Sequence, residues 1–356
     1  MIPERYADRV ELLAAEQLPE AVHRYVRQGA RDGTSVGEAS AAWDRHRFLP
    51  RVLRDVTEVD LRTTVLGTDL RSPFAVAPTA MQSAVHTRGE AAMAQGVADA
   101  GSLAVVSSNA GSTYESIGAT GAPWWAQVYV TADRPACLPL LERAVSAGAR
   151  AIVLTADTPV VGTKYDGGGE TVWDLLEPGW LQTNFPPGYG EGPGDAKATD
   201  LGPQDVEWLG QVTGLPVVVK GVLRADDARR CVDAGAAAVW VSNHGGRQLD
   251  QAAATADCLA AVVSEVGDAG EVFVDGGVRT GRHALAALAL GARAVFLGRP
   301  PVYALAVDGS VGVTRLLEEL ADELAETLRL VGCSSVAGVT EDLLSRATPV
   351  DRGTRE

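Results

Sequence analysis

The stretch Ala234-Gly-Ala-Ala-Ala-Val-Trp-Val-Ser242 indicates how this chain folds. A glycine ends a helix, a small residue follows, and a short apolar run then forms a strand. Nearly the same junction occurs twice more, as Ala147-Gly-Ala-Arg-Ala-Ile-Val153 and as Leu290-Gly-Ala-Arg-Ala-Val-Phe296. A turn that is used at three places in one chain indicates a fold built from repeated helix–strand units.

Eight apolar runs occur in this pattern along the chain. None alternates apolar with polar residues, which predicts strands covered on both faces, as in a parallel sheet with helices outside it. Eight units over about 250 residues favour a closed (β/α)₈ TIM barrel in the α/β class, with an open doubly wound sheet as the lesser alternative. The runs are Pro73–Ala77, Leu103–Ser107, Trp124–Tyr129, Ala151–Thr155, Pro216–Lys220, Ala238–Ser242, Glu271–Asp275 and Ala294–Gly298.

The composition fits one barrel with extensions. The chain has 356 residues, of which 46% are hydrophobic, so it is long enough to bury a large core. We expect a single domain over residues 1–356, with amino-terminal helices and a lead-in at 1–60, the barrel at 70–305 and carboxy-terminal helices at 306–356. Apolar residues along Val311–Leu330 predict a helix that packs outside the barrel or in a subunit contact.

The charge and the cysteines argue against several classes of function. A net charge of −15 disfavours nucleic acid and anionic membranes as partners, because both need a basic face. The four cysteines lie far apart and form no CxxC pair, which predicts reduced thiols in a cytoplasmic protein and no metal site. The first residues carry charges where a signal peptide needs an apolar segment.

A candidate catalytic base follows the expected strand Ala238–Ser242. The segment Ser242-Asn-His-Gly-Gly-Arg-Gln-Leu-Asp250 places the titratable His244 and the fixed cation Arg247 around two glycines. A turn with solvent-facing side chains would explain a lone histidine here. The other strand ends are polar too, however, and in a barrel these ends form the catalytic face. The polar residues there are Thr79, Ser107, Gln127, Tyr129, Thr155, Asp157, Lys220, Asp275 and Arg299.

Two glycine-rich segments suggest a phosphate site. Asp275-Gly-Gly-Val-Arg279 and Leu297-Gly-Arg299 end the last two expected strands, where open backbone N–H groups bind phosphate in many barrels. A tight turn alone would also explain the glycine pair. Because each segment carries an arginine, a cofactor with a phosphate group is the better interpretation. Lys220, at the end of the fifth expected strand, would be a buried cation that needs an anionic partner, such as a reduced flavin, or must lose its proton.

One connection is much longer than the others. The segment Gly162–Pro203 is rich in glycine and proline and carries Trp173, Trp180, Phe185 and Tyr189. A long loop on the catalytic face is usually either a lid or disordered, and the aromatic residues favour a lid that shields the site from water.

Taken together, these segments resemble the FMN-dependent L-2-hydroxy acid oxidase and dehydrogenase family, which includes glycolate oxidase, lactate oxidase and mandelate dehydrogenase. The resemblance runs from about Pro19 to Cys333 and keeps the motifs of all eight strands in order. It implies a (β/α)₈ barrel with non-covalently bound FMN, usually in a homotetramer. The motifs are Ala77-Pro-Thr-Ala-Met-Gln82, Gln127-Val-Tyr129, Leu154-Thr-Ala-Asp-Thr-Pro159, Val219-Lys-Gly221, Ser242–Asp250, Asp275–Arg279 and Leu297–Pro300.

The resemblance also implies roles for single residues. His244 would be the catalytic base, Asp157 the carboxylate that steadies its imidazolium, and Lys220 the cation beside the flavin. Arg247 and Tyr129 would bind the substrate. The residues implied in FMN binding are Pro78, Thr79, Ala80, Ser107, Gln127, Thr155, Lys220, Ser242, Asp275, Gly276, Gly277, Arg279, Gly298 and Arg299.

Three positions depart from the family pattern. Lys164 stands where the family has a second carboxylate-binding arginine, and it keeps the charge without the planar fork. His23 is aligned with a substrate-binding tyrosine, and Asn109 stands in place of a bulky aromatic residue. We therefore expect the clamp on the carboxylate to be weak, and bulkier 2-hydroxy acids, aromatic ones included, to be better substrates than glycolate or lactate.

The expected activity is the FMN-dependent oxidation of an L-2-hydroxy acid to the 2-oxo acid. Ala80 occupies a position where oxidases of the family tend to have Ala and several dehydrogenases have Gly, so we expect O₂ as the acceptor and H₂O₂ as a product. Three alternatives stay open: an oxidase of a larger, non-standard substrate in specialised metabolism, a dehydrogenase that uses a quinone or another acceptor, and a catalytically silent FMN-binding protein.

Overall fold

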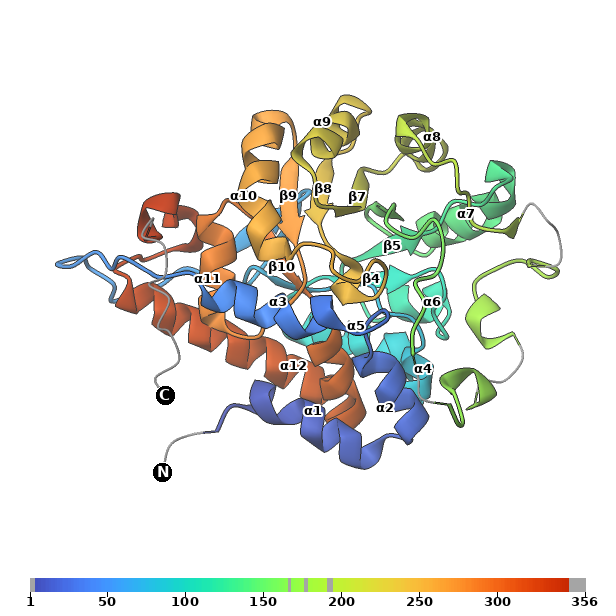
Figure 1. The fold of residues 1–356 in the computed structure, drawn as a ribbon, viewed down its shortest axis with the longest axis horizontal. Helices are drawn as coiled ribbons and strands as arrows, with labels where there is room; N and C mark the ends of the chain where they lie inside the picture. Colours follow the sequence, from blue (N-terminus) through green and yellow to red (C-terminus); the bar gives the residue numbers. More distant parts are fainter. Residues whose placement is uncertain (1–3, 166–167, 176–178, 191–194, 346–356) are drawn as a thin grey trace.

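A closed barrel of eight parallel strands forms the centre of the molecule (Figure 1). The computed structural model describes residues 4–165, 168–175, 179–190 and 195–345. The last strand pairs with the first, which confirms the expected barrel. Each expected apolar run coincides with one strand, although β7 continues beyond Lys220 to Val222. The strands are β3 (Phe74–Val76), β4 (Ala104–Ser107), β5 (Trp124–Val128), β6 (Ile152–Thr155), β7 (Val217–Val222), β8 (Ala238–Val241), β9 (Glu271–Val274) and β10 (Ala294–Leu297).

Helices connect these strands and cover the outside of the barrel (Figure 1). At the three similar junctions, Gly148, Gly235 and Gly291 have φ angles of 93°, 89° and 98°, a left-handed conformation that favours glycine at a helix end. The repeated turn predicted from the sequence is therefore present. The connecting helices are α4 (Gln82–Val85), α5 (Gly89–Asp99), α6 (Tyr114–Gly118), α7 (Leu138–Ser146), α8 (Pro203–Thr213), α9 (Ala225–Asp233), α10 (Thr255–Val266) and α11 (Gly281–Ala289), and α12 (Arg299–Leu330) follows the last strand.

Aromatic side chains fill the inside of the barrel. Trp125, Trp240, Phe273 and Phe296 belong to one buried cluster, and the ring centroids of Trp240 and Phe296 lie 3.9 Å apart. Such large side chains leave no channel along the barrel axis. Polar groups are therefore confined to the two ends of the barrel.

A short hairpin, formed by β1 (Thr63–Val65) and β2 (Thr68–Leu70), was not expected from the sequence. Val65 and Leu70 belong to the cluster inside the barrel, and the carboxylate of Glu271, the first residue of β9, accepts a hydrogen bond from the Leu66 amide. The hairpin thus closes the amino-terminal end of the barrel. Its two-residue turn at Leu66-Gly67, between two short β-prone segments, was the available sequence signal.

The two ends of the chain pack together outside the barrel. Helix α1 (Tyr6–Gln17) lies along α12, and the carboxylate of Glu319 accepts hydrogen bonds from the amides of Tyr6 and Ala7 at 2.7 and 2.8 Å (Figure 1). The expected helix at Val311–Leu330 is the second part of α12, after an interruption at Asp308 and Gly309. No helix in the described ranges is long and apolar enough to span a bilayer.

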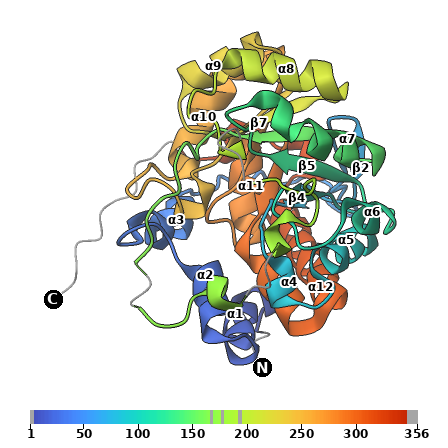
Figure 2. The ribbon, with the colours of Figure 1, turned by 90° about the vertical axis from the view of Figure 1, so that its right-hand side faces the viewer.

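Helices α2 (Glu20–Arg27) and α3 (Thr34–Asp44) bring the amino-terminal part of the chain to the barrel mouth. The amide of Ala30 donates to the carbonyl of Gly246, which follows β8. Parts of the long loop after β6 lie against α2, as Figure 2 shows for the green segment that includes η2 (Val172–Leu175). In this loop, residues 166–167, 176–178 and 191–194 lie outside the described residues.

Candidate active site

His244 and Asp157 form a close pair at the mouth of the barrel. Asp157 follows β6, His244 follows β8, and His244 Nδ1 lies 2.9 Å from Asp157 Oδ1. Burial lowers the pKa of His244, although Asp157 opposes this shift. Burial raises the pKa of Asp157 and the hydrogen bond from His244 lowers it, with a net downward shift. An ionised Asp157 accepts a hydrogen bond from Nδ1–H, which leaves Nε2 of the neutral imidazole able to accept a proton.

The backbone at His244 is in the left-handed conformation. His244, Gly245 and Gly246 have φ angles of 58°, 61° and 72°, and the left-handed conformation is uncommon for a residue with a side chain. Two side chains hold this turn: Ser242 Oγ accepts a hydrogen bond from the His244 amide at 3.1 Å, and Asn243 Oδ1 accepts one from the Gly246 amide at 3.2 Å. The turn directs the imidazole toward Asp157.

A glycine makes room for the carboxylate. Gly221 in β7 has a φ angle of 105°, and a Cβ atom there would lie 2.5 Å from Asp157 Cγ. Any side chain at this position would displace the carboxylate that orients His244. The Val-Lys-Gly motif at 219–221 therefore contributes to the pair as well as supplying Lys220.

Lys220 is a buried cation with a buried counter-ion. Its side-chain nitrogen lies 3.0 Å from Asp275 Oδ2 and donates to Ser242 Oγ at 2.7 Å. The side chains of Lys220 and Asp275 are 5% and 8% exposed, so each needs the other to stay charged. An anionic partner for Lys220 is thus present within the chain, directly after β9, which is two strands away from β7 in the barrel.

Arg279 and Arg299 form the cationic end of the site. Burial lowers the pKa of Arg299 to about 10, with further lowering from the positive charges of Arg247 and Arg279, and burial also lowers the pKa of Arg279. Arg299 donates to the carbonyls of Val26 and Gln28 at 2.9 and 3.2 Å. Neither Arg279 nor Arg299 forms an ion pair within the described part of the chain. A dianionic group between them would relieve this repulsion.

Packing against α3 explains why glycines occur at positions 276 and 277, beside Arg279. Gly277 has a φ angle of 77°, and a Cβ atom there would lie 2.2 Å from the carbonyl oxygen of Ala39 in α3. Ser40 Oγ and Trp43 Nε1 donate to the carbonyls of Gly277 and Gly276 at 2.8 and 2.7 Å. Contact with α3 is therefore sufficient to require glycine here, and the case for a phosphate rests on the two arginines.

The expected substrate residues Arg247, Tyr129 and Lys164 meet beside His244. Burial, followed by the negative charge of Asp157, raises the pKa of Tyr129, and the positive charge of Arg247 opposes this shift. Lys164 Nζ donates to the carbonyls of Gly162 and Arg247 at 2.7 and 2.9 Å. Burial, followed by the charges of Arg247 and Lys197, lowers the pKa of Lys164 to about 8. These three side chains offer hydrogen-bond donors and positive charge to a carboxylate.

His23 does not lie with them, and Tyr25 does. The guanidinium of Arg247 lies 4.8 Å from the centre of the Tyr25 ring, and Tyr25 also influences the pKa of Tyr129. His23 instead packs against Tyr303, with ring centroids 5.9 Å apart. Side chains two residues apart on a helix point in directions about 200° apart, so only one of His23 and Tyr25 can face the site. Tyr25 and not His23 therefore lies next to Arg247, and whether its phenol binds the substrate stays a prediction.

Lys197 was not expected at this site. Its ammonium lies 3.5 Å from the centre of the Tyr129 ring. Two backbone hydrogen bonds hold this end of the long loop to the exit of β5, from Ala132 N to Ala196 O at 2.7 Å and from Ala198 N to Val130 O at 2.9 Å. A single lysine in a glycine- and proline-rich loop gives no periodic or motif signal.

The described parts of the loop cover the same region. Val172 and Leu181 share a small apolar cluster with Val22 of α2 and Met81, and Trp173 meets the Tyr25 ring edge-on at 5.9 Å. Asn109 donates to the carbonyl of Leu181 at 3.4 Å, so it contacts the loop and does not simply leave space. These contacts fit a lid, which stays a prediction.

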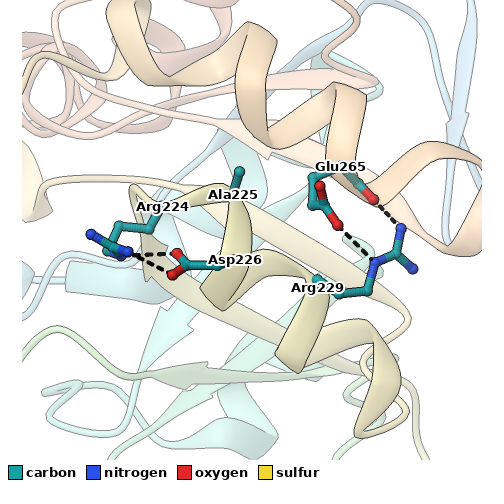
Figure 3. Close-up of a pocket in the computed structure, with 5 residues that line it drawn as sticks. All are labelled: Arg224, Ala225, Asp226, Arg229 and Glu265. Atoms are coloured by element: carbon teal, nitrogen blue, oxygen red, sulfur yellow. Dashed lines mark hydrogen bonds and ion pairs between the residues drawn. The ribbon is translucent and has the colours of Figure 1, made fainter.

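A second pocket lies on the outside of the barrel between α9 and α10 (Figure 3). Its charged side chains are already paired, Arg224 with Asp226 and Arg229 with Glu265 at 3.1 Å. None of the expected site residues lines it. We therefore place the candidate active site at the barrel mouth and not in this pocket.

Comparison with known proteins identifies the family. Residues 14–346 match the family described as FMN-dependent dehydrogenase. The chain belongs to this family. It is 40% identical to glycolate oxidase 3 of Oryza sativa subsp. indica, over 93% of this chain and 94% of that protein, and 39% identical to the L-lactate oxidase of Nostoc sp., over 94% and 96%.

Solved structures of the FMN-dependent dehydrogenase family have the same fold. A mandelate oxidase with (S)-4-hydroxymandelic acid matches with a TM-score of 0.86 and 37% identity, over 95% of this chain and 98% of that one. A lactate oxidase of Pediococcus acidilactici matches with a TM-score of 0.87 and 32% identity, over 96% and 94%. The chain is therefore an FMN-dependent enzyme of the 2-hydroxy acid oxidase class, as the sequence predicted.

The strand ends suit FMN chemically. Gln127 Nε2 and Asp275 Oδ1 are buried and have no hydrogen-bond partner within the described part of the chain, a costly state that a polar ligand would remove. A donor and an acceptor of this kind match a flavin edge and ribityl hydroxyls, and Arg279 with Arg299 match a phosphate. The remaining expected residues also lie at strand ends or directly after them, namely Pro78, Thr79, Ala80, Ser107, Thr155, Lys220, Ser242, Gly276, Gly277 and Gly298. Their individual roles stay predictions.

Proposed function

We propose that this protein is an oxidase that converts an L-2-hydroxy acid to the 2-oxo acid and transfers the electrons to O₂. The observation that carries the proposal is the His244–Asp157 pair, set beside Arg247, Lys164 and Tyr129. It combines a neutral base with donors for a carboxylate and a hydroxyl group.

The chain's residues divide the work as follows. Arg247 and Lys164 bind the substrate carboxylate, and Tyr129 bonds the substrate hydroxyl. His244 Nε2 accepts one substrate proton, and Asp157 stabilises the imidazolium that forms. Lys220, Gln127, Asp275, Arg279 and Arg299 hold FMN, which when bound accepts the two electrons that the substrate loses. With O₂ as acceptor, two electrons and two protons leave as H₂O₂.

The test of this function is turnover with a panel of acids. Purified holoenzyme is expected to release H₂O₂ with L-2-hydroxy acids, and Ala80 is the residue that favours O₂ as acceptor. Glycolate should be the poorest substrate, because it offers no side chain from which binding energy could come. H₂O₂ release and flavin bleaching report the two half-reactions separately. Slow reoxidation by air with fast turnover on a quinone would identify a dehydrogenase instead.

The pH profile of kcat/KM should have two limbs. Burial lowers the pKa of His244 from its ordinary value of 6.5, so the imidazole is still neutral at pH 6.5. The acid limb, where the base becomes protonated, should therefore lie below pH 6.5. Above about pH 8, Lys164 loses its proton and the carboxylate binds less tightly, so KM should rise. Lys164→Arg keeps the charge and should move the alkaline limb upward by at least one pH unit. An unmoved alkaline limb would mean that Lys164 does not bind the carboxylate.

Tyr25 and His23 provide a matched pair of substitutions on one helix. Tyr25→Phe removes a phenol next to Arg247 and should raise KM by about 10- to 100-fold, the usual effect of one hydrogen bond to a charged group. His23→Phe alters a ring that packs on Tyr303 and should change kcat/KM by less than about 3-fold. Steady-state kinetics on one substrate measures both. The reverse ranking would restore His23 as the substrate residue.

A further inference from the structure

The three lysines of this chain share one place in the fold. The chain has 31 lysine and arginine residues, of which only Lys164, Lys197 and Lys220 are lysines. Lys164 and Lys220 were already expected at the mouth of the barrel. Lys197 lies 3.5 Å from the Tyr129 ring centre, so it belongs to the same mouth. All the remaining residues of this set are arginines. The compact, strongly hydrated ammonium groups of lysine therefore occur only at the barrel mouth.

The side chain of Lys197 is half-buried over the Tyr129 ring. Burial lowers its pKa, and the negative charge of Asp157 partly opposes this shift. No carboxylate lies within ion-pair distance of Lys197 in the described ranges, and its ammonium lies over the ring face of Tyr129. A cation over an aromatic face gains some stabilisation but keeps its ability to donate hydrogen bonds to a ligand.

The charges around Tyr129 do not balance. Arg247, Lys164 and Lys197 influence one another or Tyr129 electrostatically, and they bring three positive charges. The nearby carboxylate, Asp157, is committed to His244 at 2.9 Å. A substrate with one carboxylate neutralises one of three cations and leaves Lys197 without a counter-ion. A substrate with a second anionic group would neutralise a second of these cations and give Lys197 a counter-ion.

We propose that Lys197 is a specificity-determining residue that binds a second anionic group, so that 2-hydroxydicarboxylic acids are the preferred substrates. This inference rests on the proposed 2-hydroxy acid oxidation and narrows its substrate class. The first carboxylate binds to Arg247 and Lys164, and the second binds to Lys197 on the returning limb of the long loop. That limb is fixed by the hydrogen bonds of Ala196 and Ala198, so the ammonium is held in place before the substrate arrives.

Matched substrate pairs isolate the second charge. L-Malate is compared with L-2-hydroxybutanoate, and L-2-hydroxyglutarate with L-2-hydroxypentanoate, because the members of each pair have the same number of carbon atoms. For wild-type holoenzyme, kcat/KM should be higher for the diacid of at least one pair. Lys197→Met should lower kcat/KM for that diacid by about 10- to 100-fold, mainly through KM, and change the monoacid by less than about 3-fold.

Two further variants guard against a general structural effect. Lys197→Arg keeps the charge and should retain at least about a tenth of the diacid activity. Arg224→Met removes an exposed cation that is already paired with Asp226 and should leave all four substrates unchanged. Calorimetric binding of malonate to the oxidised holoenzyme gives a readout that does not depend on turnover. Malonate should bind about 10-fold or more weakly to Lys197→Met than to wild type.

Failure of the proposed 2-hydroxy acid oxidation and failure of the proposed role of Lys197 give different results. If no 2-hydroxy acid reduces the wild-type flavin, the proposed oxidation itself is wrong. If monoacids are oxidised well and Lys197→Met leaves the ratio of diacid to monoacid unchanged, only the role of Lys197 is wrong. An equal loss on both members of a pair would make Lys197 a positioning residue for Tyr129 and would also overturn the proposal.

Discussion

Replacing His244 with alanine is expected to slow flavin reduction by about 10²- to 10⁴-fold while FMN stays bound. His244 Nδ1 is taken by Asp157, so Nε2 is the atom available to accept the substrate proton. The residues proposed to hold the cofactor, among them Lys220, Asp275 and Arg299, are untouched by the change. Anaerobic stopped-flow bleaching of the flavin band at saturating substrate measures the reduction step directly.

The control for this prediction is a histidine outside the site. The chain has five histidines, and His86 accepts a hydrogen bond from the nearby Arg88 amide, away from the Asp157 pair. His86→Ala should reduce its flavin at the wild-type rate. His244→Gln, which keeps a side-chain amide near Asp157, provides a second test if the alanine variant folds poorly. Reduction of either His244 variant within about 10-fold of wild type would exclude His244 as the base.

Replacing Arg299 with alanine should weaken FMN binding by about 10²- to 10⁴-fold, the effect of losing two charge-assisted hydrogen bonds to a phosphate. Arg299 and Arg279 are partly buried cations, burial lowers the pKa of both, and the charge of Arg279 further lowers the pKa of Arg299. A phosphate dianion would compensate both charges. Fluorescence quenching of FMN titrated into deflavinated protein gives the dissociation constant. The fraction of the variant that does hold FMN should still be reduced by substrate.

Arg282→Ala is the matched control for that titration. Arg282 lies in the first turn of α11, three residues beyond Arg279, and is exposed. Its removal changes the net charge by the same amount and should alter the FMN dissociation constant by less than about 3-fold, because an exposed charge is screened by salt. Equal weakening of FMN binding in both variants would show that the effect comes from the net charge and that Arg299 does not contact the phosphate.

The sequence was sufficient to predict the barrel and most of the site. Runs such as Ile152–Thr155 and Val217–Val222 are apolar on both faces, which only a covered parallel sheet accommodates, and the repeated glycine turns set their spacing. Once the strands close, their carboxyl ends must lie on one face. Asp157 and His244 therefore come together although 87 residues separate them in the chain.

Other features depend on geometry that a sequence pattern does not encode. Tyr25 and His23 lie two residues apart on α2 and face different directions. His23 packs against Tyr303, and Tyr25 packs against Arg247. Lys197 reaches Tyr129 because two backbone hydrogen bonds attach its loop to β5, and no periodicity marks such an attachment. The β1–β2 hairpin is short and became recognisable only by its burial against the barrel interior.

The last turn of α2 connects the beginning of the chain to both ligand sites. Arg247 donates to the carbonyls of Tyr25 and Gln28, and Arg299 donates to those of Val26 and Gln28. These arginines are the ones assigned to the substrate carboxylate and to the FMN phosphate, so the attachment of this helix is coupled to what the arginines bind. Amide hydrogen exchange and tryptic cleavage within residues 20–28 should therefore slow when FMN and a substrate analogue are bound.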